Sequence, residues 1–153
     1  MNIGIIDADL IGAKKHRFPN LASMKISSYN KGIGNEVKLI TTYDEDFSQY
    51  DDIYLSKVFT ATEVPRNVIE LPNIHCGGTG FFYDKAPPLK DEIEHCMPDY
   101  HLYDEWISTL VERERERERE RERRKFRFPN SNGIQTTVSV LQLEDVFANA
   151  HSA

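Results

Sequence analysis

Residues Asn2–Asp7 read NIGIID, a short apolar run that ends in an acidic residue. Such a run is typical of a strand buried in a parallel sheet. A polar loop is predicted to follow over residues 7–19. Asn20 is then well placed to cap a helix, and Gly32 and Gly34 are placed to end that helix. The sequence therefore opens with a strand, a loop and a helix.

The same alternation continues along the chain. Further strands are predicted at 36–41, 53–59 and 73–76, with a short helix at 64–71 and an exit helix at 101–110. Strands that alternate with helices imply βαβ units, so we expect an α/β fold with a doubly wound, mostly parallel, Rossmann-like sheet. Ligands of such sheets bind at the carboxyl ends of the strands. These ends are predicted at residues 7–15, 57–60 and 77–82.

Charge and cysteine content restrict the function classes. The net charge is −6, but the tract at 112–125 contributes six acids and eight bases, which leaves 19 acidic and 11 basic residues elsewhere. An acidic body of this kind argues against nucleic acid as a partner. No run approaches the roughly 20 apolar residues of a membrane span, and no signal peptide is recognisable. Cys76 and Cys96 are the only cysteines, which favours free thiols and a cytoplasmic location.

A glycine cluster follows the last predicted strand. Backbone amides of Gly77, Gly78, Thr79 and Gly80 could approach a phosphate closely. The spacing does not fit G-x-G-x-x-G, so a tight turn is the alternative. The basic residues at 14–17 fit either a phosphate or simple solvation.

Several segments together resemble the front end of a radical S-adenosylmethionine (radical SAM) family protein. The resemblance covers residues 1–106 and is carried by MNIGIIDADLIG, KKHRFPNLASMKIS, LSKVFT, GGTGFFYDKAPPL and EIEHCMPDYHLYDEW. In that family the front end is similar to a cobalamin-binding domain, and the PDYxLYD-type stretch leads toward the catalytic barrel. The resemblance implies an iron-sulfur cluster and S-adenosylmethionine as cofactors of the intact protein.

Cobalamin binding itself is left open by the residues present. Histidine-ligating cobalamin domains carry D-x-H-x-x-G after the first strand, and the matching positions here are Asp7, Asp9 and Gly12. Asp9 stands where the histidine would be, and a hard carboxylate is a poor substitute for an imidazole. Cobalamin is therefore expected to bind without that ligand or not at all, and both acids fit equally well as caps of a strand end and a turn. The predicted cofactor-binding residues are Asp7, Asp9, Gly12, Gly77, Gly78, Thr79 and Gly80.

A second cluster invites a metal-site interpretation. His95, Cys96, Asp99, His101 and Asp104 lie close together in sequence. Their spacing matches neither HExxH nor the usual zinc pairs, so a linker that packs against a following domain explains them better. We expect no metal site and no catalytic residue in this chain.

The charged tract alternates glutamate and arginine strictly from Glu112 to Arg123. A helix would place opposite charges three residues apart but like charges four residues apart, so these charge pairs would stabilise the helix little in total. A solvated segment, partly helical or disordered, is expected. The predicted organisation is a Rossmann-like domain at 1–110, a low-complexity tract at 111–125 and a poorly structured tail at 126–153, the last two forming an irregular charged tail.

The genetic code adds a further inference about the tail. An alternating GA tract encodes Glu-Arg in every reading frame, so a frame change inside it is invisible in the protein. If the reading frame is moved back by one base, each new codon consists of the last base of one codon and the first two bases of the next. Over residues 133–153, the codons shifted in this way permit the sequence YTDYSIGFTTRGCFRKCxFC. This string contains C-x-x-x-C-x-x-C, the radical SAM signature, at the place where the family has it. We therefore interpret residues 126–153 as out of frame.

In the intact family protein, three thiolates hold the cluster and leave one iron open for S-adenosylmethionine, whose reductive cleavage yields a radical. The present chain lacks those thiolates. The sequence thus predicts an accessory domain that is not catalytic as translated, with the missing barrel or an unknown small molecule as its partner. The alternative is a free-standing module of Rossmann-like fold that binds a small ligand or another protein.

Overall fold

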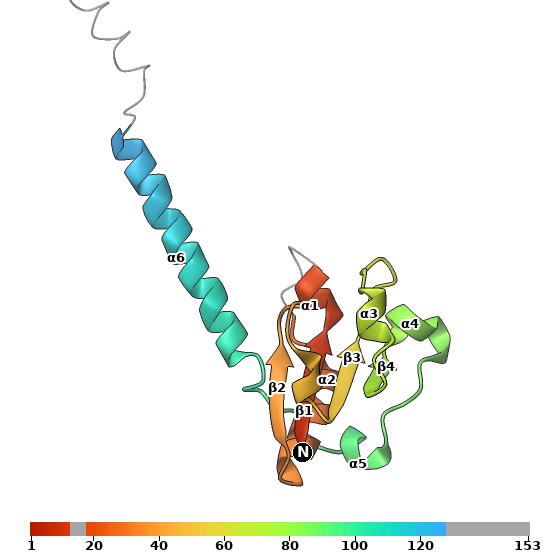
Figure 1. The fold of residues 1–153 in the computed structure, drawn as a ribbon. Coiled ribbons are helices and arrows are strands. Elements are labelled where there is room, and N and C mark those ends of the chain that lie inside the picture. The colour runs from red at the N-terminus through yellow and green to blue at the C-terminus, as the bar shows by residue number, and fades with distance from the viewer. Residues whose placement is uncertain (13–17, 128–153) are drawn as a thin grey trace, which may run out of the picture. The chain divides into compact units, whose positions relative to one another are not determined.

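A four-stranded parallel sheet forms the centre of the compact unit at residues 1–107 (Figure 1). The computed structural model describes residues 1–12 and 18–127. The strands are β1 (Asn2–Asp7), β2 (Glu36–Ile40), β3 (Asp52–Ser56) and β4 (Ile74–Gly77). Their order in the sheet is β2-β1-β3-β4, and Ile5 of β1 pairs with Leu39 on one side and Tyr54 on the other. The predicted α/β fold with a Rossmann-like parallel sheet is confirmed.

Helices and turns cover both faces of the sheet, because successive strand residues point to opposite sides. Ile5 belongs to a core cluster with residues of α2 (Leu21–Gly32) and α5 (Asp91–Glu94), whereas Ile6 belongs to a cluster with Val68 of α3 (Arg66–Ile69). None of the helices in the described part of the chain combines the length and the apolar character that crossing a membrane requires. The helical elements are α1 (Ala8–Gly12), α2 (Leu21–Gly32), η1 (Phe47–Gln49), α3 (Arg66–Ile69), α4 (Thr79–Phe82), η2 (Tyr83–Lys85), α5 (Asp91–Glu94) and α6 (Asp104–Arg127).

Several elements differ from their predicted bounds for local reasons. The segment after β1, predicted as a loop, begins with the helical turn α1. β3 ends at Ser56, short of residue 59, because the Val58 amide donates to the Asp9 carboxylate and leaves the ladder. α3 is shorter than the predicted helix at 64–71, since Leu71 precedes Pro72 and is disfavoured in a helical conformation.

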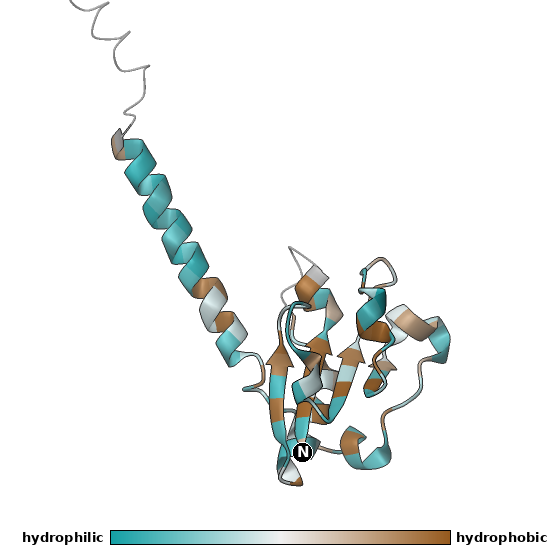
Figure 2. Cartoon of the chain, in the orientation of Figure 1, coloured by the Kyte–Doolittle hydropathy of each residue, from teal (hydrophilic) through white to brown (hydrophobic). Residues whose placement is uncertain are grey.

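The charged tract is helical where it is described. α6 continues through it to Arg127, so up to that residue the segment is regular rather than irregular. Its side chains from 111 to 126 are exposed, and Figure 2 shows the hydrophilic character of most of the helix. Arg117 lies 3.7 Å from Glu114, the three-residue spacing predicted for opposite charges. The first compact unit spans residues 1–107, close to the predicted boundary at 110, and the predicted tail at 128–153 lies outside the described residues.

Candidate functional site

The carboxyl ends of three strands bring predicted site residues into one row. Parallel pairing places Asp7 of β1 beside Ser56 of β3, and Ser56 beside Gly77 of β4. Asp7 is fully buried, and Ser56 is 9% exposed. The order β2-β1-β3-β4 places the topological switch point at the carboxyl ends of β1 and β3, where open α/β sheets bind their ligands. The position just outside these two strand ends is called here the switch-point gap.

Tyr103 reaches this switch point from the far end of the compact unit. Its hydroxyl donates a 2.9 Å hydrogen bond to Oδ2 of Asp7, and its side chain is among the most completely buried in the protein. Burial and, second, the charge of Asp7 raise the pKa of Tyr103. The phenol therefore remains a neutral donor to the carboxylate at physiological pH.

Asn20 joins the same network from the start of α2. Its backbone N–H donates to the Tyr103 hydroxyl at 3.1 Å, and its side-chain amide donates to Oγ of Ser56 at 2.8 Å. Its Oδ1 accepts from the backbone amides of Ala22 and Ser23, which confirms the predicted helix cap. A single residue thus caps the helix and links Tyr103 to Ser56 at the end of β3.

Asp9 accepts hydrogen bonds from several residues of the segment 57–62, called here the 57–62 loop. It is fully buried, and its Oδ2 accepts from the Val58 amide at 2.7 Å. Its Oδ1 accepts from the Thr62 hydroxyl at 2.5 Å and from the Phe59 amide at 3.4 Å. Both oxygens are committed to the protein's own donors, which favours the turn-capping interpretation of this residue.

The glycine cluster packs against the same loop. A Cβ at Gly78 would lie 2.3 Å from the backbone oxygen of Lys57, and Gly78 has a φ of 99°. The Gly80 amide donates to that Lys57 oxygen at 2.8 Å, and the Thr79 hydroxyl donates to the Val58 oxygen at 3.0 Å. These contacts favour a tight turn at the cluster, since the amide of Gly80 is already used within the protein.

The electrostatics of this edge are governed by its buried acids. Burial, followed by the charges of Asp9 and Asp7, raises the pKa of Tyr43 to about 12. Lys57 bonds to the Thr62 oxygen at 3.1 Å and lies 4.8 Å from the centre of the Phe81 ring. Two carboxylates at the strand ends disfavour a phosphate there. Gly12 ends α1, and the basic residues at 14–17 lie outside the described part of the chain.

The histidine and cysteine cluster behaves as a packed linker. Asp99 accepts from the hydroxyl of Ser27 at 2.7 Å and from Lys31 at 2.6 Å, and its own amide donates to the Met24 oxygen. Exposed His101 bonds to Asp104 within its own segment. Among the described residues, no group of three or more side chains could hold a metal ion.

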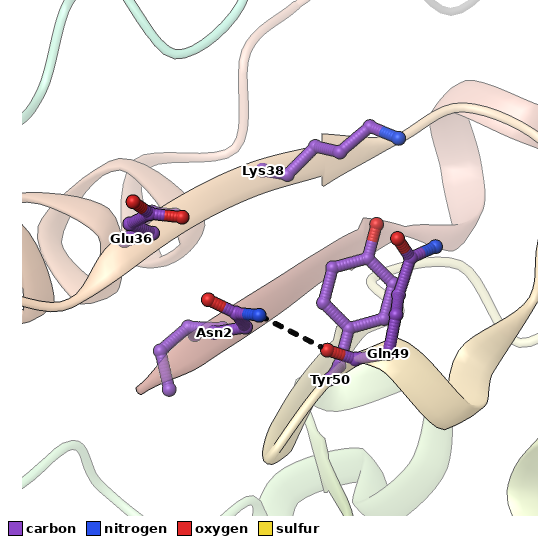
Figure 3. Close-up of a pocket in the computed structure, with 7 residues that line it drawn as sticks. Asn2, Glu36, Lys38, Gln49 and Tyr50 are labelled. Carbon is purple, nitrogen blue, oxygen red and sulfur yellow. Dashed lines mark hydrogen bonds between the residues drawn. The ribbon is translucent and has the colours of Figure 1, made fainter.

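A small pocket lies at the opposite, amino-terminal edge of the sheet (Figure 3). The side-chain amide of Asn2 donates to the Gln49 oxygen at 3.3 Å beside it, and Tyr50 bonds through its hydroxyl to Glu45. No motif in the sequence indicated this pocket. Its volume is about 190 Å³, and its lining residues are Asn2, Ile3, Glu36, Val37, Lys38, Gln49 and Tyr50.

Sequence reasoning missed three members of the network at the carboxyl edge. Tyr103 and Ser56 lie in stretches that carry the resemblance, but nothing in those stretches indicated their contacts, and 96 positions separate Tyr103 from Asp7. Thr62 lies in none of the quoted stretches. Asp7, Asp9 and the helix cap at Asn20 were the members that the sequence did indicate.

Comparison with known proteins adds no relative. No model of a known family matches the chain, and neither a curated protein nor a solved structure matches it.

Proposed function

We propose that residues 1–110 are the accessory domain of a radical SAM protein, and that the chain as translated leaves the family's reading frame before its cysteine signature. One observation carries the proposal. When the reading frame of residues 133–153 is moved back by one base, it permits the cysteine signature C-x-x-x-C-x-x-C at the position in the chain where the family has it.

The contacts within the compact unit support this proposal. The stretches that carry the resemblance are far apart in sequence, yet they bond to one another at one edge of the sheet. Asp9 of DADLIG bonds to Val58 of LSKVFT, and Gly80 of GGTG bonds to Lys57 of the same stretch. Tyr103 of LYDEW bonds to Asp7 of IIDAD. These contacts place the stretches in one domain, which the proposal requires.

The translated chain would have no radical chemistry of its own. Three thiolates are needed to hold a cluster with an open iron, and Cys76 and Cys96 are the only two cysteines. Cys76 lies on β4, and burial raises the pKa of its thiol, which disfavours the thiolate that binds iron. In the intact protein, the cluster and S-adenosylmethionine would supply the radical from the barrel. We place the chain in the cytoplasm, in keeping with its two free thiols.

Sequencing the gene across the Glu-Arg tract tests the proposal. An open frame downstream that encodes the three cysteines and a full barrel would support it. Stop codons in every frame soon after the codon for Ala153 would refute it and favour a free-standing binding module.

A biochemical test addresses the translated chain. After anaerobic reconstitution with iron and sulfide, the purified chain is expected to show no iron-sulfur absorption and to leave S-adenosylmethionine intact. Near-stoichiometric iron with cleavage of S-adenosylmethionine would contradict the proposal.

A further inference from the structure

The switch-point gap between β1 and β3 is where the resemblance places cobalamin, so its residues can be tested for fit. The ligand position of the histidine-ligating domains is held by Asp9, which is fully buried. Its two oxygens accept from Val58, Phe59 and Thr62. A carboxylate that is enclosed in this way offers cobalt neither an imidazole nor a free oxygen. The residues present do not fit histidine-type cobalamin binding.

The gap is also filled by the protein itself. The Tyr103 hydroxyl lies 2.9 Å from Oδ2 of Asp7 and 3.1 Å from the Asn20 amide, and Asn20 bonds in turn to Ser56. Tyr103 is 1% exposed, and its ring packs edge-on against Trp106. The Tyr103 hydroxyl, Asn20 and Ser56 are thus linked to one another and to Oδ2 of Asp7 by hydrogen bonds within the protein.

The segment that supplies Tyr103 is held to the domain at more than one point. Asp99 bonds to Ser27 and Lys31 of α2, and its amide donates to the Met24 oxygen. Leu102 and Tyr103 belong to the same core cluster as Ile5 and Met24. The segment is therefore docked along α2, with Tyr103 as its deepest residue.

We infer that the switch-point gap is a socket for Tyr103 and not a cobalamin site. In this arrangement, Tyr103 occupies the position where this fold commonly binds a cofactor, and it thereby holds residues 98–107 on the sheet. The inference goes beyond the proposed function, since an accessory domain of a radical SAM protein can exist with or without cobalamin. Its failure would leave the gene-sequencing test unaffected.

The first test asks whether the full chain binds cobalamin. The chain is incubated with hydroxocobalamin and separated by gel filtration, and cobalt and the absorption spectrum of the protein fraction are measured. No retained cobalt is expected. Near-stoichiometric cobalt on the wild-type chain would overturn the inference.

The second test asks whether the Tyr103 hydroxyl fastens the segment. Tyr103→Phe keeps the ring but removes the bonds to Asp7 and Asn20, and hydrogen exchange of residues 20–23 and 102–107 is expected to become about tenfold faster. Tyr100→Phe is the matched control, since Tyr100 lies in the same segment but is 65% exposed, and it should leave exchange unchanged. Equal exchange in the two variants would overturn the inference.

A third variant keeps the test decisive if Tyr103→Phe does not fold. Ser56→Ala removes only the acceptor of the Asn20 amide and should accelerate exchange at residues 20–23 by a smaller factor. Unchanged exchange there would contradict the network on which the socket depends.

Discussion

Replacing Asp9 gives the sharpest test of how the carboxyl edge is built. Its carboxylate accepts two short bonds, at 2.7 Å from Val58 and 2.5 Å from Thr62, and one long bond from Phe59. Hydrogen bonds to charged groups contribute about 1.5–3 kcal/mol each. Removal of the side chain also relieves the cost of burying a carboxylate, so Asp9→Ala is expected to lower the free energy of unfolding by about 2–4 kcal/mol.

A second substitution at the same position separates the hydrogen bonds from the charge. In Asp9→Asn, the amide oxygen can still accept from Val58 while the amide nitrogen donates to the Thr62 hydroxyl. The long bond from Phe59 and the charge are lost. The expected decrease is about 1 kcal/mol, clearly smaller than that of the alanine variant.

Urea unfolding of the full chain, followed by fluorescence, measures these effects. Trp106 is the only tryptophan and packs against Tyr103 in the compact unit, so its emission reports on that unit. Asp84→Ala is the matched control, because Asp84 is an exposed acid on η2, and it should change stability by less than about 0.5 kcal/mol. An Asp9→Ala variant as stable as this control would refute the role assigned to Asp9.

Three further predictions concern other parts of the chain. Gly78→Ala should lower stability by about 2–4 kcal/mol, because its φ is positive and its Cβ would meet a backbone oxygen, whereas Gly32→Ala, with open space around it, should be neutral or slightly stabilising in the same urea assay. Burial alone would raise the pKa of Asp99, but hydrogen bonds from Lys31, Ser27 and His101 outweigh burial and lower that pKa. The stability that the Asp99 carboxylate contributes is therefore present above its unfolded pKa of about 3.9 and is lost as the pH falls through its folded pKa. Asp99→Asn should therefore be destabilising at pH 7, with a difference from wild type that shrinks below about pH 4 in urea titrations. Trypsin should cut first within the exposed arginines at 113–124 and leave a resistant fragment near residues 1–110, and a resistant tract would contradict the separate character of that unit.

One prediction concerns the gene rather than the folded chain. We expect the frame break to lie inside the Glu-Arg tract and to have arisen by slippage of one dinucleotide unit, since one added unit gives the observed offset. Deep sequencing of the tract in a clonal population checks this. Mixed tract lengths would indicate a reversible switch, one fixed length a dead gene, and a tract that keeps the cysteine frame open would show that the printed chain is an artefact of sequencing.

The sequence by itself determined where the strands lie along the chain, the helix that starts after Asn20 and the edge of the sheet where the polar residues gather. These features depend on local periodicity and capping, which a sequence displays directly. The position of Asp9 in a turn and the tight turn at Gly78 could be named as alternatives, because both depend on residue types over a few positions.

Only the tertiary structure decided what these residues contact. Asp7 meets a tyrosine 96 positions away, and Asp9 bonds to a loop 49 to 53 positions away. Such partners are fixed by the parallel register and by the path of the chain across α2, and neither leaves a local signal. The helical state of the tract could not be predicted from its charge pattern, because favourable pairs of opposite charges and unfavourable pairs of like charges nearly cancel in a helix. The location of the polar residues at the strand ends was thus predictable, but the chemistry there depends on which distant side chains the fold brings to these ends.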